Sequence, residues 1–145
     1  MPLTRDDGTR ELLTSARTIA VFGCSDRPDR PSYGVSAFLQ RHGYRMLPVN
    51  PQITGERVHG EFVWRDLGQI GVPIDIVDIF RRPIAAGEAV DQVIAAGAKA
   101  VWMQLGIVNE EAAARAEAAG LKVVMDRCTK IEIMRLDIPA LSDAT

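Results

Sequence analysis

Five short apolar runs, separated by polar and alanine-rich segments, constrain the fold of this chain more than any other feature of its sequence. The runs cover residues 18–23, 45–50, 74–80, 100–107 and 122–126. Apolar and polar residues do not alternate strictly within them, which is typical of strands that are buried on both faces of a parallel sheet. We therefore predict that each run contains one strand of such a sheet.

The segments between the runs carry signals for helix starts and helix ends. Ser32 and Asn109 are suitable N-cap residues, and Gly97 is suitable just past a helix end. The predicted helices cover about residues 5–16, 32–42, 83–97 and 109–120. The longer segment 51–73 is less regular, and we predict a loop with a short helix near residues 64–70 there.

Strands that alternate with helices imply right-handed crossover connections and a doubly wound α/β sheet. We predict a single, mainly parallel, five-stranded sheet of Rossmann-like type. With the runs numbered along the chain, the expected strand order is 3-2-1-4-5. The 145 residues fit one domain, in which a Rossmann-like core over about residues 17–136 follows the first helix in the sequence.

Charge and composition exclude several classes of protein. The chain has 17 basic and 19 acidic residues and a net charge of −2, whereas nucleic-acid-binding domains usually carry a basic excess. No apolar run approaches the roughly 18 residues of a membrane span, and no signal-peptide core is present at the N-terminus. We expect a cytoplasmic protein with no nucleic-acid or membrane partner.

Ligands of open α/β sheets bind outside the carboxyl ends of the strands, beside the first strand. The residues that follow the five runs at this edge are 23–33, 50–52, 81–83, 104–106 and 126–128. Five of the 14 arginines are among them: Arg27, Arg30, Arg81, Arg82 and Arg127. Because guanidinium groups and helix N-termini both bind phosphates, we predict a site for a multiply phosphorylated ligand. The alternative is that these arginines are ordinary loop residues.

The usual nucleotide fingerprints are absent from the sequence. No Gly-x-Gly occurs, so the dinucleotide motif is missing. Gly55 and Gly60 have the spacing of a phosphate-binding loop, but Glu61 follows where that loop needs lysine. An NAD site also needs an acidic residue at the end of the second strand, where this chain has Asn50. An NAD(P)-binding sensor is therefore a weak alternative.

Five motifs in order along the chain carry a resemblance to a known family. They are GCSDRPDRPSYGV (23–35), LPVNP (47–51), VDIFRRP (77–83), WMQLGI (102–107) and MDRCTKIE (125–132). Over about residues 10–136 the chain resembles the small stand-alone CoA-binding proteins of bacteria and archaea. That group is similar to the N-terminal CoA-binding domain of the succinyl-CoA synthetase α-subunit.

The resemblance implies that coenzyme A lies along the strand ends. It places Gly23, Cys24 and Ser25 by the phosphates or pantetheine; Arg30, Ser32 and Tyr33 by the phosphates and adenosine; Asn50 and Pro51 by the adenine and ribose; Phe80 and Arg81 on the nucleotide's other side; Gln104 and Gly106 along the pantetheine arm. One departure concerns Gln52, which stands where many relatives carry a lysine or arginine that could meet the ribose 3′-phosphate. Arg30 or Arg57 could substitute for that contact.

The function implied is that of a coenzyme A or acyl-CoA binding module without its own catalytic machinery. The alternative is a CoA-ligase component that needs a separate ATP-grasp partner. His42 and His59 are expected to be surface or capping residues, without a neighbouring nucleophile that would make a catalytic pair. No metal-binding spacing is present. We therefore predict no catalytic and no metal-ligating residue.

Two acidic residues and two cysteines remain. Asp75 and Asp78 lie on opposite faces of one predicted strand, so one of them should lie under a helix. We expect a carboxylate that is bonded to a helix or loop donor, and an acid/base role is the alternative. Cys24 and Cys128 should lie about two strand spacings, roughly 9–10 Å, apart, which is too far for a disulfide. We expect buried thiols, although either could form a mixed disulfide with CoA if it is sufficiently exposed.

Overall fold

A five-stranded parallel sheet forms the centre of the fold. The structure, a computed structural model, describes residues 2–141. The strands of the sheet are β1 (Thr18–Phe22), β2 (Arg45–Val49), β5 (Ile76–Ile79), β6 (Ala100–Met103) and β7 (Lys122–Val124). Each lies within one of the five apolar runs, so the predicted strands are confirmed. Two short strands, β3 (Arg57–Val58) and β4 (Glu61–Phe62), form a separate antiparallel hairpin.

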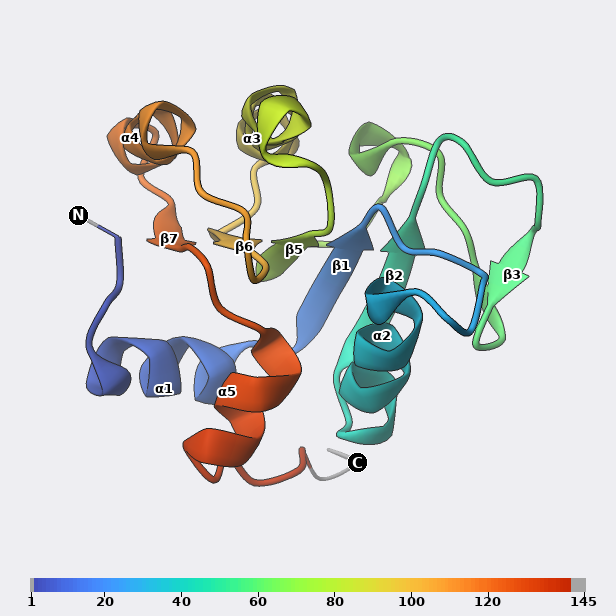
Figure 1. Ribbon diagram of the computed structural model, residues 1–145, viewed down its shortest axis with the longest axis horizontal. Helices are drawn as coiled ribbons and strands as arrows, with labels where there is room; N and C mark the ends of the chain where they lie inside the picture. The colour runs from blue at the N-terminus through green and yellow to red at the C-terminus, as the bar shows by residue number, and fades with distance from the viewer. Residues whose placement is uncertain (1, 142–145) are drawn as a thin grey trace.

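Helices cover both faces of this sheet (Figure 1). One face carries α3 (Pro83–Ala96) and α4 (Glu110–Ala118), and the other carries α1 (Asp6–Ser15), α2 (Pro31–Arg41) and α5 (Thr129–Arg135). A short 3-10 helix, η1 (Leu67–Gln69), precedes β5. The doubly wound α/β architecture is therefore confirmed.

The strands divide their side chains between two apolar layers. In β6, Val101 and Met103 face the layer under α3 and α4, whereas Ala100 and Trp102 face the layer under α1, α2 and α5. All four of these side chains are fully buried. Burial on both faces explains why the apolar runs show no strict alternation.

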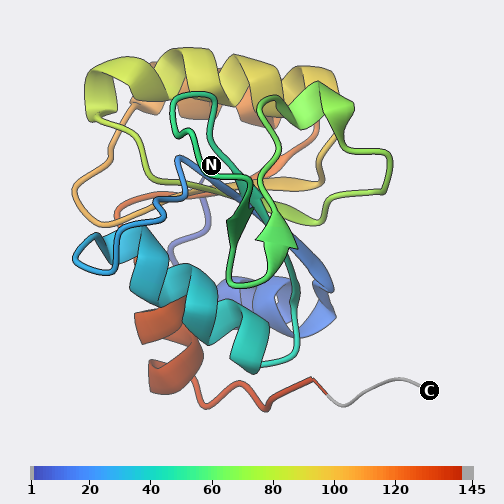
Figure 2. The same cartoon turned by 90° about the vertical axis from the view of Figure 1, so that its right-hand side faces the viewer.

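The predicted strand order is wrong for one strand. The observed order is β2-β1-β5-β6-β7, so the run at 74–80 lies beside β1 rather than outside β2. The outer edge of β2 is already occupied by Trp64, which forms an isolated parallel bridge with Val49. The backbone N–H of Trp64 donates to the carbonyl of Pro48 at 2.9 Å. Figure 2 shows the β3–β4 hairpin on this side of the sheet. The chain then crosses to the other side of β1, where β5 pairs.

The helix signals are confirmed at some positions and wrong at others. Asn109 caps α4 by accepting a hydrogen bond from the N–H of Ala112 at 2.9 Å, and Gly97 ends α3 with φ +74°. Ser32 is not an N-cap, because α2 begins at Pro31 and Arg30 stands at the cap position. Helix α5 was not predicted from the sequence.

Candidate functional site

A cleft of about 750 Å³ opens along the carboxyl ends of the strands. Its walls come from the turn after β1, the start of α2 and the loops after β2, β5, β6 and β7. Of the predicted site residues, those that line the cleft are Gly23, Ser25, Arg30, Ser32, Asn50, Phe80, Arg81, Gln104 and Gly106. The fold therefore gathers residues from distant parts of the chain at the edge that the sequence predicts.

Three predicted site residues do not line the cleft. Cys24 is fully buried in the core layer of α2. Tyr33 packs its ring against His59, with 4.4 Å between the ring centroids. Pro51 lines a smaller neighbouring cavity. A residue's position just after a strand or in the first turn of α2 does not fix the direction of its side chain.

The sequence reasoning missed part of the apolar wall. Val35, Ile53 and Ile107 line the cleft. Val35 follows Ser32 by three positions in α2, so the helical period offered a signal for it. No comparable signal marked Ile53.

Four arginines make the cleft cationic. Arg27, Arg30, Arg81 and Arg82 line it, and Asp26 is the one acidic residue among its lining residues. The guanidinium of Arg81 lies over the Phe22 ring, 5.2 Å from the ring centroid. The fifth arginine, Arg127, follows β7 as predicted, but it lines an adjoining cavity rather than the cleft.

The turn after β1 brings backbone close to the ligand edge. Gly23 has φ +90°, and its N–H donates to the carbonyl of Val49 at 2.7 Å. A Cβ at this position would lie 2.4 Å from the carbonyl oxygen of Phe80. The turn is thus packed between the ends of β2 and β5, where only glycine fits.

The loop between β1 and α2 is held by serine side chains. The buried hydroxyl of Ser32 accepts a hydrogen bond from the N–H of Ser25 at 2.9 Å, and the Ser25 hydroxyl accepts one from the N–H of Arg27 at 3.0 Å. These bonds fold the loop over the N-terminus of α2. Arg27 and Arg30 are carried beside the positive end of the α2 dipole as a result.

Asn50 connects the loops after β1 and β2. Its amide Nδ2 donates to the carbonyl of Cys24 at 2.9 Å, and its Oδ1 accepts from the N–H of Gln52 at 2.9 Å. Gln52 lines the cleft together with Arg30. Arg57 is not among the lining residues, and its Nη1 donates to the carbonyl of Gly60 at 2.9 Å. Of the two arginines considered as substitutes for a basic residue at 52, only Arg30 lines the cleft.

A chain of buried polar groups lies behind the wall of the cleft. The Thr129 hydroxyl lies 2.9 Å from Oδ2 of Asp78 and 3.3 Å from Oε1 of Gln104. Oδ1 of Asp78 has no hydrogen-bond partner among the described residues. Complete burial raises the pKa of Asp78 well above its usual value. A protonated Asp78 can donate to Thr129, which leaves the Thr129 proton for Gln104.

We expect Asp78→Asn to flatten the pH dependence of stability. Because the pKa of Asp78 is raised on folding, its contribution to stability is complete below the pKa of the unfolded chain and is lost as pH rises towards the folded value. Above about pH 4, the unfolding free energy of the wild type should fall by up to roughly 1.4 kcal/mol per pH unit relative to that of the variant, until the pH reaches the raised pKa of the folded state. Urea unfolding at several pH values measures this difference, and parallel curves would contradict it.

The other strand carboxylate has the structural role that the sequence predicts. Asp75 accepts hydrogen bonds from the backbone N–H groups of Arg17 at 2.8 Å and Thr18 at 3.0 Å, and it pairs with Lys99 at 3.3 Å. These donors hold the pKa of Asp75 below its usual value, although partial burial opposes them. Asp78 likewise binds the hydroxyl of the first α5 residue. Neither carboxylate lines the cleft.

The expectation for the histidines is correct for His42 and wrong for His59. His42 stands at the C-cap of α2, with Nε2 2.9 Å from the carbonyl of Ile138. His59 is half-buried, and its Nε2 lies 3.0 Å from the Ser36 hydroxyl and 2.9 Å from the carbonyl of Tyr33. A hydroxyl therefore neighbours this imidazole, contrary to the prediction. Ser36 is fully buried and already donates to Tyr33, so the contact anchors the hairpin to α2.

Both cysteines are free and buried, as predicted. Burial raises the pKa of Cys24 to about 11, which disfavours its reactive thiolate. Cys128 is 7% exposed and lines the cleft. The expected separation of two strand spacings is wrong, because both β5 and β6 lie between β1 and β7. Cys128 is the cysteine at the ligand edge.

Membrane-spanning helices and metal-ligating clusters are both absent from the described residues. Among residues 2–141, no helix is long and apolar enough to span a membrane. The same part of the chain holds no group of three or more His, Cys, Asp or Glu side chains that could bind a metal ion.

The fold and the cleft define a Rossmann-like α/β domain with an arginine-lined cleft at the carboxyl ends of its strands. Residues 17–134 match the family described as "CoA binding domain", and the chain belongs to this family. The resemblance noted from the five motifs is therefore confirmed. The chain is 40% identical over 122 residues to the uncharacterized protein YneT of Bacillus subtilis (strain 168), covering 84% of this chain and 89% of YneT.

Solved structures share this fold. A hypothetical protein from Pyrococcus horikoshii OT3 has a TM-score of 0.87 and 38% identity, covering 94% of this chain and 96% of that chain. A dinucleotide forming acetyl-coenzyme A synthetase 1 of Ca. Korarchaeum cryptofilum has a TM-score of 0.69 and 22% identity, covering 78% of this chain and 26% of that chain. The second likeness concerns the fold alone.

Proposed function

We propose that this chain binds coenzyme A or an acyl-CoA in the cleft and acts as a binding module. The observation that carries the proposal is that four arginines and the start of α2 line one cleft in a member of the CoA-binding domain family. Coenzyme A carries a diphosphate and a ribose 3′-phosphate, so its binding requires several cationic or N–H donors close together. Guanidinium groups and a helix N-terminus supply such donors.

The distribution of charge supports one orientation of the ligand. The arginines lie after β1 and β5, so the phosphates are proposed to bind at that end. The other end of the cleft, at Gln104, Leu105 and Gly106, carries no charged side chain of its own. Its amide and apolar groups suit the amides and methylenes of the pantetheine arm.

An NAD-type ligand is less well supported. The residue after β2 is Asn50, and its amide nitrogen and oxygen both bind backbone groups of the protein. Asn50 therefore offers the ribose hydroxyls of NAD neither a carboxylate nor a free amide group, whereas NAD sites commonly bind them with a carboxylate.

The finer question is whether the chain acts alone or as one component of a CoA ligase. The fold likeness to a quarter-length part of a longer synthetase raises the second alternative. The binding module is favoured because His42 and His59 both bind carbonyl groups of the protein and neither lines the cleft. A pull-down followed by an ATP- and CoA-dependent ligase assay separates the two, since a co-purifying partner with turnover would establish the ligase component.

Calorimetric titration of the full chain with CoA, acetyl-CoA, NAD and NADP tests the proposed ligand. We expect one-to-one binding of CoA and acetyl-CoA, with NAD and NADP roughly tenfold or more weaker. NAD lacks the ribose phosphate and NADP carries it on the 2′-oxygen rather than the 3′-oxygen, so each loses a charge-assisted contact. If NAD or NADP bound at least as tightly as CoA, the proposal would be overturned. Mass spectrometry of the ligand that co-purifies with the protein gives an independent answer.

A further inference from the structure

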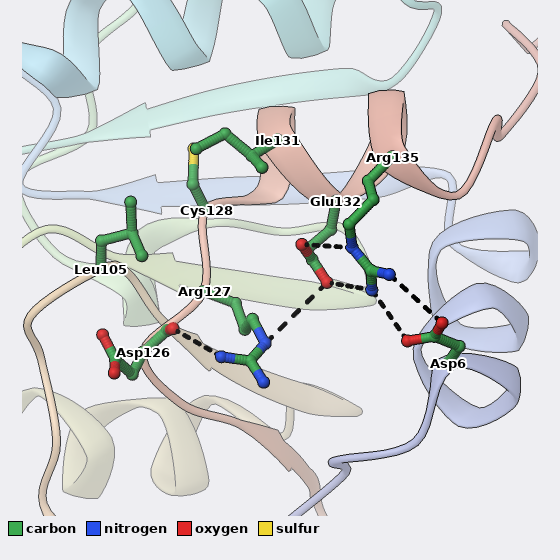
Figure 3. A pocket seen from close by; sticks show the side chains of 8 residues that line it. All are labelled: Asp6, Leu105, Asp126, Arg127, Cys128, Ile131, Glu132 and Arg135. Atoms are coloured by element: carbon green, nitrogen blue, oxygen red, sulfur yellow. Dashed lines mark hydrogen bonds and ion pairs between the residues drawn. The ribbon is translucent and has the colours of Figure 1, made fainter.

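A second cavity adjoins the cleft, and we propose that it receives the uncharged acyl group of a bound acyl-CoA. This inference rests on the proposed function. The cavity has a volume of about 370 Å³ and lies between the loop after β7, α5 and the start of α1 (Figure 3). The side chains that line it are Asp6, Leu105, Asp126, Arg127, Cys128, Ile131, Glu132 and Arg135.

The cleft and the second cavity share part of their walls. Leu105 and Cys128 line both of them. In the proposed orientation, the pantetheine arm passes Gln104 and Gly106, so its sulfur arrives beside Leu105 and Cys128. A group esterified to that sulfur must extend further in the same direction, and the second cavity is the next space.

The entrance to the second cavity is apolar. Leu105 is 57% exposed and Ile131 is 45% exposed, and both line the cavity together with Cys128. Figure 3 shows these three side chains grouped on one side of the cavity. Methylene groups that cover Leu105 and Ile131 would remove apolar surface from water, which favours binding.

The charged side chains of the cavity pair with one another and leave an excess of one carboxylate. Arg135 Nη2 donates to Asp6 Oδ1 and to Glu132 Oε1, each at 2.8 Å, and Arg135 Nε donates to Glu132 Oε2 at 3.1 Å. Arg127 Nε lies 3.9 Å from Glu132 Oε1. With Asp126, three carboxylates face two guanidinium groups. An acyl chain that ends in a carboxylate would meet this acidic excess, so the cavity favours chains that end in a methyl group.

Affinities for CoA, acetyl-CoA, butyryl-CoA and succinyl-CoA test the inference. Butyryl and succinyl groups have the same number of carbons and differ in whether a methyl or a carboxylate ends the chain. We expect butyryl-CoA to bind roughly 15-fold more tightly than acetyl-CoA, because it has two further methylenes and each buried methylene contributes roughly fourfold. Succinyl-CoA should bind more weakly than butyryl-CoA.

A variant pair on one helix connects this effect with the cavity. Ile131→Asn changes a lining residue, and Met134→Asn changes a 56% exposed residue of α5 that lines neither cavity. Ile131→Asn should bring the ratio of butyryl-CoA to CoA affinity towards one, whereas Met134→Asn should leave the ratio at its wild-type value.

The outcomes separate this inference from the proposed function. If CoA binds but butyryl-CoA gains nothing over it, the acyl cavity is disproved and the CoA cleft stands. The same holds if the ratio is unchanged in Ile131→Asn. If no CoA thioester and no CoA binds, the proposed function fails and the acyl cavity fails with it.

Discussion

Gly23→Ala is expected to destabilise the protein by about 3 kcal/mol or more. A left-handed backbone costs an alanine roughly 1–2 kcal/mol, and the new Cβ would also lie 2.4 Å from the carbonyl oxygen of Phe80. That oxygen belongs to backbone next to β5, so relief of the contact requires the turn after β1 to move away. Urea unfolding measures the loss of stability, and calorimetry of the variant should show that CoA affinity falls with it.

Gly34→Ala is the matched control for this change. Gly34 is exposed in α2, and an added Cβ would meet no atom within 4 Å. Alanine is the better helix former, so this variant should gain roughly 0.5–1 kcal/mol. Wild-type stability in Gly23→Ala would show that the turn adjusts freely and that its fit against Phe80 is unimportant.

Arg30→Ala is expected to weaken CoA binding by about 1.5–3 kcal/mol, which corresponds to roughly 10- to 150-fold. Arg30 lines the cleft beside the N-terminus of α2, where a charge-assisted bond to a phosphate is proposed. Gln52 stands where many relatives carry a lysine or arginine that could meet the ribose 3′-phosphate. Arg30 lines the same cleft and is therefore the favoured partner of this phosphate. Calorimetry with CoA and dephospho-CoA measures both the loss and its origin, since the variant should no longer distinguish the two ligands.

Arg41→Ala provides the control for the loss of a positive charge. Arg41 is exposed in the last turn of α2, at the end of the helix away from the cleft. This variant should bind CoA as the wild type does. If Arg30→Ala still discriminated fully between CoA and dephospho-CoA, the 3′-phosphate contact would belong to another arginine of the cleft, such as Arg81 or Arg82.

The strands could be predicted from the sequence because strands buried on both faces consist mostly of apolar residues. Their order in the sheet could not be predicted in this way. The order depends on the path of residues 51–73, and there a single residue, Trp64, occupies the edge of β2. No local sequence pattern predicts that bridge.

Helix α5 was not predicted because it is short and its apolar residues do not lie on one face. Two of its seven residues, Ile131 and Met134, are apolar and exposed, so the sequence lacks an amphipathic pattern.

The site was predictable only to the level of the backbone. Parallel strands bring their carboxyl ends to one edge, so the segments that line the cleft followed from topology. The directions of the side chains did not follow, as Cys24 and Tyr33 show. The contacts among Asp78, Thr129 and Gln104 join three segments far apart in the chain, and only the folded structure reveals them.

The Trp64 bridge also restricts how this protein can associate with other chains. An open sheet edge offers a row of unpaired N–H and C=O groups, onto which a foreign strand can add. At β2 that row is interrupted by the pairing of Trp64 with Pro48 and Val49, and the Trp64 carbonyl accepts from the N–H of Asn50 at 2.8 Å. A strand added along β2 would first have to displace this segment, so the Pro48–Asn50 end of the edge is closed to strand-mediated aggregation.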